Sequence, residues 1–531
     1  MKFKYYKELH SLKNIRFIDR KKKIYKKQII KFLNEFHNIN NTDAYWSVII
    51  DYWLSYFLFY IQYKINTFGI NKNLNYFYLK KNNIFFNTTE ELSQSLVNSD
   101  DLDTYVNNVI KSLFKKNKFN GNFKKINKIT NITKTNFYYS FISKLISLYI
   151  FFIKPMVIVE GYFGYKNSIR IFLRSFGKIL IIPRCLLFNY GIKDSIINYD
   201  IRNKIKVNEK DLFDRIFNNL LINFIPKSFL ENYDDIKNKF LFYINNITKL
   251  GSATLHYIND DFNIFLAEFK KKKKNFYIFQ HGAYYGLLKY DLREVRDRQV
   301  AFKTYYWNNK KGLGFNYLTR FKKISSKYLV NNNKIIYFAA PIKKYGITSI
   351  LMANADYSAD QDGSTAIKIF NNLNNKLKPE YLYRAIKISL HVNSLYKYTN
   401  KVIKNIRKHK INLDRNLSSK ISFNEAKIII LDNFSTAFYE CIYIGTPVIV
   451  ITDINKFNFK EDIKNIFIRL KDKGLIYDNP ESAAIFLNEN YDNLINWWNN
   501  LFYSKLMKEL KVLLFHEDKD FCRKIVFELK K

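Results

Sequence analysis

The sequence predicts an α/β protein with two Rossmann-like domains, because short apolar runs alternate with helical patterns in both halves of the chain. In the first half, strand-like runs at 156–159 and 178–182 flank a helical segment. In the second half, runs at 427–431 and 448–451 do the same. A strand–helix–strand unit implies a crossover and therefore a parallel sheet. Two such halves facing each other across a cleft form the simplest architecture.

The composition fits a globular, strongly basic protein. The chain has 531 residues, of which 47% are hydrophobic, and its formal net charge is +42. Lys, Asn, Ile and the aromatic residues are all favoured by an AT-rich coding sequence, so we expect much of this charge to be solvated lysine. A basic surface still attracts phosphates, nucleotides, anionic lipids or nucleic acid. No zinc-finger spacing or RNA-recognition motif supports a specific nucleic-acid partner.

The three cysteines, Cys185, Cys441 and Cys522, are far apart in the sequence. This spacing is typical of a reducing compartment, and it argues against a disulfide framework and a cysteine-rich metal site. The first ten residues have no apolar core of the signal-peptide type. We therefore expect a cytoplasmic protein, with the inner face of the membrane as a further option.

One N-terminal segment is nearly long enough and apolar enough to span a bilayer. It covers residues 44–60, but Asp51 lies near its middle, where an unpaired acid is costly. We predict instead an aromatic helix buried in the protein. The similar segment at 137–153 is interrupted by Lys144.

We divide the chain into three parts. Residues 1–136 form a helical, aromatic-rich extension packed on the first domain, 137–330 form the first Rossmann-like domain, and 331–531 form the second, with closing helices at the C-terminus. The junction is placed at the polar triplet 331–333, because a strand-like run begins directly after it.

The most specific local signal is FQHGAYYG at 279–286. His281 follows a predicted strand, and Gly282 allows close approach of the backbone. A neutral histidine at this place can take a proton from an attacking hydroxyl, so Gln280, His281 and Gly282 are candidate catalytic residues. Glu294 or Asp297 could orient the ring. The alternatives are a structural histidine and surface ion pairs with nearby arginines.

A second candidate site lies where the helix after strand 427–431 begins. The N–H groups of that helix suit a phosphate, and Ser435 and Thr436 stand at its start. Glu440 lies one turn later and could accept hydrogen bonds from sugar or ribose hydroxyls. The alternative is that the hydroxyl residues only cap the helix. Arg384 and Lys387 could neutralise a leaving diphosphate.

The sequence lacks the motifs that mark several other classes of enzyme. The sequence contains no phosphate loop ending in Gly-Lys-Ser/Thr, no GxGxxG opening a helix and no GxSxG. The acidic loop 356–362 lacks the spacing of a calcium site. These residues do not favour a divalent ion, and we predict no bound cofactor.

With these motifs, the chain resembles a family of transferases from bacterial surface-polysaccharide and O-antigen loci. Four islands carry the resemblance over most of the chain: LNEFHNINNTDAYWSVIIDYW, QHGAYYG, NFSTAFYE with GTPVIVI, and LKDKGLIYDNPESAA. The matching N-terminal positions are Leu33, Asn34, His37, Tyr45, Trp46 and Trp53. Later matches are Trp307, Trp497 and Trp498. The family usually has QHGG, so Ala283 is a departure, and the acidic positions after it are less regular here.

The resemblance implies a GT-B-like fold, distantly similar to teichoic-acid CDP-glycerol glycerophosphotransferases. It implies that His281 is the general base on the acceptor and that Ser435, Thr436 and Glu440 bind the nucleotide donor, without a bound metal. The implied partners are a nucleotide-sugar donor and a lipid-linked or saccharide acceptor. Two alternatives remain open: a nucleotide-sugar epimerase, and a non-catalytic basic protein that binds nucleic acid or anionic membrane.

Overall fold

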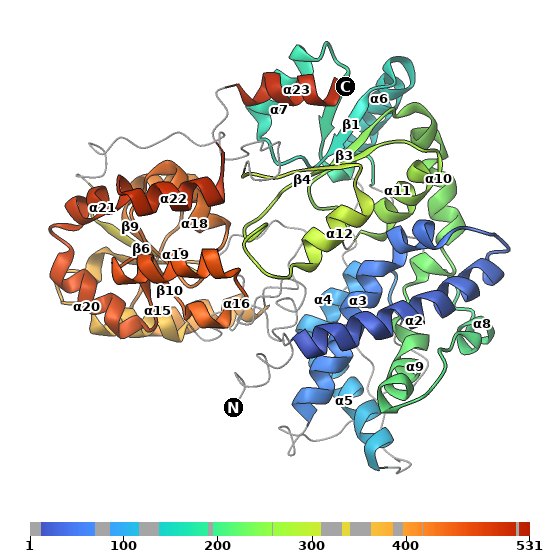
Figure 1. The fold of residues 1–531 in the computed structure, drawn as a ribbon, viewed down its shortest axis with the longest axis horizontal. Coiled ribbons are helices and arrows are strands. Elements are labelled where there is room, and N and C mark those ends of the chain that lie inside the picture. Colours follow the sequence, from blue (N-terminus) through green and yellow to red (C-terminus); the bar gives the residue numbers. More distant parts are fainter. Residues whose placement is uncertain are drawn as a thin grey trace.

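The computed structural model describes residues 12–68, 85–115, 137–188, 195–257, 259–308, 332–339, 363–385, 397–416, 418–516 and 520–530. Its two sheets are built from parallel strands, as Figure 1 shows. The first sheet has the order β2-β1-β3-β4-β5. Its strands are β1 (Met156–Val159), β2 (Ile179–Ile182), β3 (Leu250–Ser252), β4 (Phe276–Phe279) and β5 (Lys303–Tyr305).

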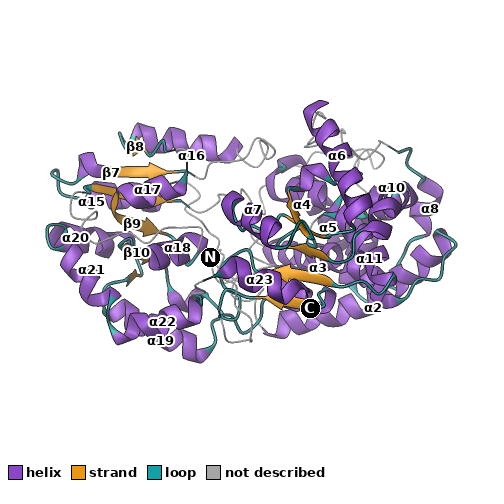
Figure 2. Cartoon of the chain, turned by 90° about the horizontal axis from the view of Figure 1, so that it is seen from above, coloured by secondary structure: helices purple, strands orange, loops and turns teal. Residues whose placement is uncertain are grey.

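The second sheet has the order β11-β10-β9-β6-β7-β8. Its strands are β6 (Lys334–Phe338), β7 (Tyr381–Arg384), β8 (Asn412–Leu413), β9 (Ala426–Leu431), β10 (Val448–Ile451) and β11 (Ile476–Tyr477). Figure 2 shows the two sheets as separate groups of strands, each with helices around it. The predicted α/β class with two Rossmann-like domains is confirmed.

Helices cover both sheets and form the N-terminal part. The extension contains α2 (Leu12–Phe36), α3 (Asp43–Phe68), α4 (Thr89–Asn98) and α5 (Asp100–Lys115). The first domain contains α6 (Phe137–Ile153), α7 (Tyr165–Arg174), α8 (Tyr199–Lys204), α9 (Leu212–Phe224), α10 (Tyr233–Asn246), α11 (Asp260–Lys271) and α12 (Leu292–Val300). The second contains α15 (Ser364–Asn372), α16 (Lys397–Lys408), α17 (Ser419–Glu425), α18 (Thr436–Ile444), α19 (Glu461–Asp472), α20 (Pro480–Asn490), α21 (Leu494–Phe502) and α22 (Lys505–Leu514). The last helix is α23 (Phe521–Lys530).

The strand–helix–strand unit predicted in the second half is present. β9 and β10 pair in parallel, with Val448 opposite Ile429, and α18 connects them. Gly445 ends α18 with φ of 95°, a left-handed conformation that favours glycine. The apolar residues of both strands are buried. The sequence pattern therefore located this unit to within a residue at each end.

The N-terminal extension packs around the predicted aromatic helix. α3 is buried along most of its length, and Asp51 on it is only 2% exposed. The carboxylate lies 3.5 Å from Lys22 Nζ and 3.3 Å from Lys26 Nζ, so the buried charge is compensated by α2. Among the described residues, no helix is both long and apolar enough to cross a membrane.

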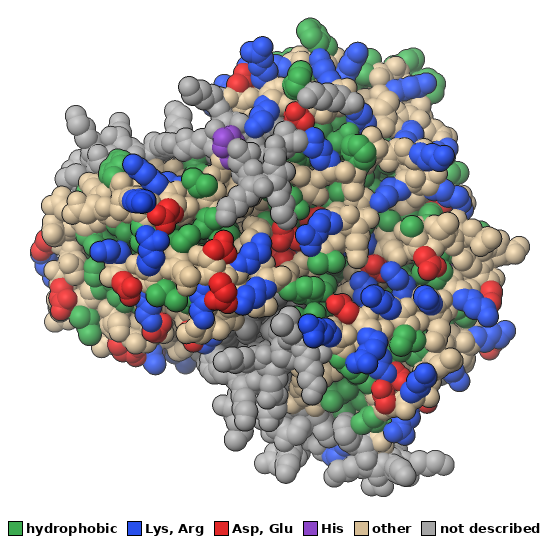
Figure 3. Space-filling view, in the orientation of Figure 1, with side chains coloured by type: hydrophobic (Ala, Val, Ile, Leu, Met, Phe, Trp, Pro, Cys, Tyr) green, Lys and Arg blue, Asp and Glu red, His purple; other side chains and the backbone are tan. Residues whose placement is uncertain are grey.

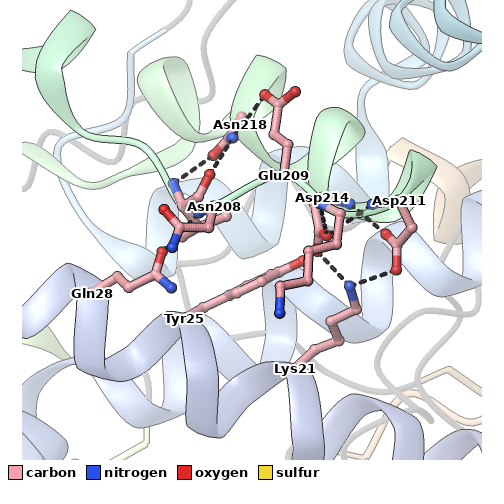
Figure 4. Close-up of polar contacts among 10 residues, drawn as sticks. Lys21, Tyr25, Gln28, Asn208, Glu209, Asp211, Asp214 and Asn218 are labelled. Atoms are coloured by element: carbon pink, nitrogen blue, oxygen red, sulfur yellow. Dashed lines mark hydrogen bonds and ion pairs between the residues drawn. The ribbon is translucent and has the colours of Figure 1, made fainter.

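Polar contacts attach α2 to the first domain, as Figure 4 shows. Lys21 Nζ donates to Asp211 at 2.7 Å and also pairs with Asp214, which accepts from Tyr25 as well. Gln28 accepts from the backbone N–H of Asn208 at 2.8 Å. These contacts join elements that are distant in sequence, so the extension is an integral part of the first half.

The C-terminal helix returns to the first domain. α23 lies against α7 (Figure 1), and its apolar residues share a core with β1 of the first sheet. Arg174 on α7 forms an ion pair with Asp520, just before α23. The sequence division assigned this helix to the second domain. Its amphipathic pattern shows only that one face is buried and leaves open which sheet covers it.

Candidate functional site

The loop after β4 is held in place mainly by Gln280. Its side chain donates from Nε2 to Gly282 O at 2.8 Å and accepts from Trp307 N at 2.8 Å. Its backbone carbonyl accepts from Trp307 Nε1, also at 2.8 Å. Gln280 is 4% exposed. Its contacts therefore fix the backbone on either side of His281, and a catalytic role for Gln280 stays a prediction.

His281 lies in an aromatic pocket at the end of β4. Its ring centroid is 5.5 Å from that of Tyr257 and 6.0 Å from that of Tyr285. Burial, followed by the charges of Arg293 and His256, lowers the pKa of His281 to about 3. The backbone of Ala253 opposes this shift. The ring is therefore neutral at physiological pH, which is the state a general base requires.

The two carboxylates proposed to orient His281 are buried in the same region. Asp297 accepts from His256 Nε2 at 2.7 Å and from Tyr257 Oη at 2.8 Å. Asp297 therefore hydrogen-bonds His256 and not His281. Its link to His281 is indirect, because the ring of its other partner, Tyr257, lies 5.5 Å from the His281 ring. Glu294 is 5% exposed and also lies on α12. An orienting role for either residue stays a prediction.

Ser435 and Thr436 stand at the start of α18. Ser435 is the N-cap residue, but its side chain makes no capping hydrogen bond. Both side chains are partly exposed, whereas Glu440 is buried one turn later. The helix therefore begins with two hydroxyl groups next to its first N–H groups, the arrangement that binds phosphates in many α/β proteins.

The two predicted sites meet in the structure. A Cβ placed on Gly282 would lie 3.9 Å from Thr436 Oγ1 and 3.7 Å from Arg293 Nη1. Close by, the N–H of Tyr284 donates to Tyr439 Oη of α18 at 3.1 Å. The loop after β4 and the start of α18 thus face each other, beyond the carboxyl ends of β4 and β9. Ligands in open α/β sheets bind at such edges.

Further contacts fix the two domains to each other beside this point. Leu288 and Phe459 form an antiparallel bridge, and Lys460 Nζ donates to Gly286 O at 2.6 Å. The Tyr284 ring stacks on Phe457 at 6.0 Å. Tyr284 has φ of 76°, an uncommon backbone conformation for a bulky residue. Such backbone strain clusters at ligand-binding and active sites.

Of the two basic residues predicted to neutralise a leaving diphosphate, the structure describes Arg384 but not Lys387. Arg384 Nη1 donates to Asp414 at 2.7 Å and to Ser422 Oγ at 2.8 Å. Burial alone would raise the pKa of Asp414, but hydrogen bonds from Ser422 and Arg384 hold it below its usual value. The charge of Arg384 is therefore compensated within the domain. Lys387 lies outside the described residues.

Arg293 is a site residue that the sequence did not single out. It is 6% exposed, pairs with Asp291 Oδ2 at 2.6 Å and donates to Ala283 O at 3.1 Å. Its guanidinium lies over the Tyr285 ring at 4.9 Å. In the sequence it is one of three arginines on a short helix, and the helix pattern alone does not show that Arg293 and Arg296 are buried while Arg298 is exposed. Across the described ranges, no cluster of three or more His, Cys, Asp or Glu side chains could hold a metal.

Comparison with known proteins gives one family match. The LIC12162 family transferase model matches residues 7–509. No curated protein matches the chain. Among solved structures, Acinetobacter baumannii MurG is similar at 10% identity and a TM-score of 0.34, over 71% of this chain and 98% of that one. A glycosyltransferase from Rickettsia africae is similar at 14% identity and a TM-score of 0.34, over 71% and 99%.

Proposed function

Because the chain belongs to the LIC12162 family of transferases, we propose that it moves a sugar or polyol-phosphate group from a nucleotide-activated donor to a surface-polysaccharide acceptor, such as an O-antigen or capsule precursor. The observation that carries this proposal is the approach of Gly282 to Thr436. It brings a candidate base from one domain next to a candidate phosphate site from the other. An acceptor and an activated donor have to meet in this way.

The donor binds with its diphosphate at the start of α18. The first N–H groups of the helix and the hydroxyls of Ser435 and Thr436 donate hydrogen bonds to phosphate oxygens. Glu440 would repel a phosphate, but its carboxylate can accept from a ribose or sugar hydroxyl. Arg293, whose Nη1 lies 3.7 Å from the Cβ position of Gly282, supports the negative charge that develops as the diphosphate leaves.

The acceptor binds near His281. The neutral ring removes the proton from the attacking hydroxyl. The hydroxyl oxygen forms a bond to the donor carbon or phosphorus, and the bond to the leaving nucleotide breaks with its electron pair. A histidine with a pKa of about 3 is a weak base. A bound diphosphate would raise this pKa, because a nearby negative charge stabilises the protonated ring.

We expect one nucleotide to stabilise the protein selectively. Thermal unfolding is measured with CMP, CDP, UDP, GDP and dTDP, for the wild type and for Ser435→Ala and Thr436→Val. The variants should lose the stabilisation by that nucleotide, because they lack the hydroxyls that bind its phosphates. At 100 times Kd, binding stabilises a protein by about 2.7 kcal/mol, which is a shift of a few degrees.

The matched control is Ser482→Ala, which removes a partly exposed hydroxyl from the first turn of α20. It should keep the full nucleotide response. Loss of the response in Ser482→Ala, or an equal response in all variants, would contradict a donor site at α18. Conversion of a nucleotide sugar without any acceptor would favour an epimerase instead.

We also propose that α6 places the protein on an anionic membrane, at its cytoplasmic face. Lys144 is the one charged residue of α6, and the helix exposes a row of large apolar side chains: Phe141, Leu145, Leu148, Phe151, Phe152 and Ile153. Lys154 follows, and α7 carries no acid and three basic residues, of which Arg174 pairs with Asp520. Figure 3 shows hydrophobic and basic side chains side by side on the upper part of the molecule. This combination is typical of helices that lie in a lipid interface.

Replacing Phe152, which is 75% exposed, should weaken binding to vesicles. Burying such a side chain in the lipid interface contributes about 1.5–3 kcal/mol to the free energy of membrane binding. Phe152→Ser should therefore weaken vesicle binding by about ten-fold or more. Co-sedimentation with vesicles of phosphatidylglycerol and phosphatidylcholine measures the effect. Val512→Ser, at a site on α22 that is 64% exposed, is the control. Equal binding of both variants would rule out α6 as the docking surface.

A further inference from the structure

A cavity of about 560 Å³ lies between the N-terminal extension and the first domain. None of its lining residues belongs to the loop after β4 or to α18. Its walls come from α2, the turn at 40–42, the start of α3 and the ends of α11 and α12. The cavity is therefore separate from the site proposed for the donor.

The cavity carries a surplus of positive charge. Lys26, Lys270, Lys271 and Arg296 line it, together with a single carboxylate, that of Asp51. That carboxylate is already shared by Lys22 and Lys26. Burial, followed by the charge of Arg296, lowers the pKa of Lys270. Asp297 also lies near Arg296. Within the described residues, Lys270 Nζ donates to Val300 O at 2.6 Å and Lys271 Nζ donates to Asn41 Oδ1 at 2.8 Å, so these two hydrogen bonds go to neutral oxygens.

Arg296 is the most constrained of these cations. It is 4% exposed, and it donates to the backbone carbonyls of Ser47, at 2.7 Å, and Val48. Its Nε is buried and has no hydrogen-bond partner among the described residues. This buried atom is not reached from the cavity, so Arg296 attracts an anion there through its charge. A guanidinium is suited to phosphate oxygens.

The remaining lining residues suggest what else the ligand carries. Side chains of Asn40, Asn41, Thr42, Ser47 and Gln299 supply amide and hydroxyl groups of the kind that bind sugar hydroxyls. The volume lies in the range of sites for small organic ligands and exceeds what a lone phosphate needs.

We propose that this cavity binds a small phosphorylated carbohydrate, with the phosphate held by Arg296 and Lys271 and the hydroxyls held by the amides at 40–41 and Gln299. The site does not depend on the proposed donor site. A ligand bound here joins α2 and α3 to α11 and α12, so it would also stabilise the attachment of the extension.

Isothermal titration calorimetry of the full chain tests the site, with glucose 1-phosphate, inorganic pyrophosphate and glucose as probes. We expect both phosphates to bind and glucose not to bind. Lys271→Gln should weaken phosphate binding by about ten-fold or more, because it removes a charged hydrogen-bond donor. Lys272→Gln is the matched control, since its side chain is exposed, has the same charge and does not line the cavity.

A second variant leaves the charge unchanged. Ala44→Phe places a ring at an exposed position that lines the cavity, and it should also block binding. Thr436→Val should bind these probes as the wild type does, which separates this site from the donor site. No binding by the wild type at millimolar concentration, or equal loss in Lys271→Gln and Lys272→Gln, would overturn the proposal.

Discussion

His281→Ala is expected to lower kcat by about 10²–10⁴-fold while the protein stays folded, because general-base catalysis typically contributes that much. The ring is partly exposed, and its neighbours Tyr257 and Tyr285 are held by other contacts. Tyr257 Oη bonds both Tyr285 and Asp297, so this network persists without the imidazole. Transfer is measured with the nucleotide that stabilises the protein, and folding is checked by thermal unfolding. Full activity in a folded His281→Ala protein would remove this residue from the mechanism.

The pH profile gives an independent test of the same residue. Because the pKa of His281 is lowered to about 3, its ring stays neutral as the pH falls through the usual histidine value of about 6.5. The fall of kcat/KM at low pH gives the pKa of the essential base in the free enzyme, and it should therefore not be centred near pH 6.5. A fall centred at about 6.5 that disappears in a variant of another histidine, such as His256→Asn, would assign the base elsewhere.

Arg293→Leu is expected to destabilise the protein by about 3–5 kcal/mol, because it leaves the buried carboxylate of Asp291 without its partner. Asp291 is 2% exposed, so water cannot replace the lost cation. The change also removes the hydrogen bond to Ala283 O and the contact with Tyr285, which shape the loop around His281. Urea unfolding measures the loss.

The control for Arg293 lies on the same helix. Arg298→Leu removes an exposed guanidinium from α12, and surface substitutions usually change stability by less than about 0.5 kcal/mol. Adding Asp291→Asn to Arg293→Leu should recover part of the stability, since it removes the stranded charge and keeps a residue that can cap α12. Equal losses in Arg293→Leu and Arg298→Leu would show that the buried pair contributes little.

Local sequence patterns predicted β1, β2, β4, β6, β9 and β10, but they did not predict the short strands β3, β5, β8 and β11. The unit from β9 to β10 was predicted closely because its signals are local: β-branched runs, small polar residues at a helix start, and Gly445 with Pro447 at its end. α3 was recognised as buried because Asp51 makes a membrane span costly. In each case the deciding residues lie within a few positions of one another.

Contacts between distant segments could not be predicted in the same way. The sequence shows a histidine and two acids near one another, but tertiary packing decides that Asp297 bonds His256 rather than His281. Likewise, nothing local to Arg384 reveals Asp414 as its partner. The approach of Gly282 to Thr436 depends on how the two domains dock. Motifs identified each half of the candidate site, and only the fold shows that the halves meet.

The central claim is that one catalytic site is built from both domains, with the donor diphosphate lying at the start of α18 and against the loop after β4. Hydrogen–deuterium exchange, with and without the nucleotide that stabilises the protein, tests it most directly. We predict that peptides covering residues 280–288 and 435–440 are protected together by the same nucleotide, and that Thr436→Val loses both protections. Protection of only one of these segments, or of neither while the nucleotide still binds, would contradict the claim.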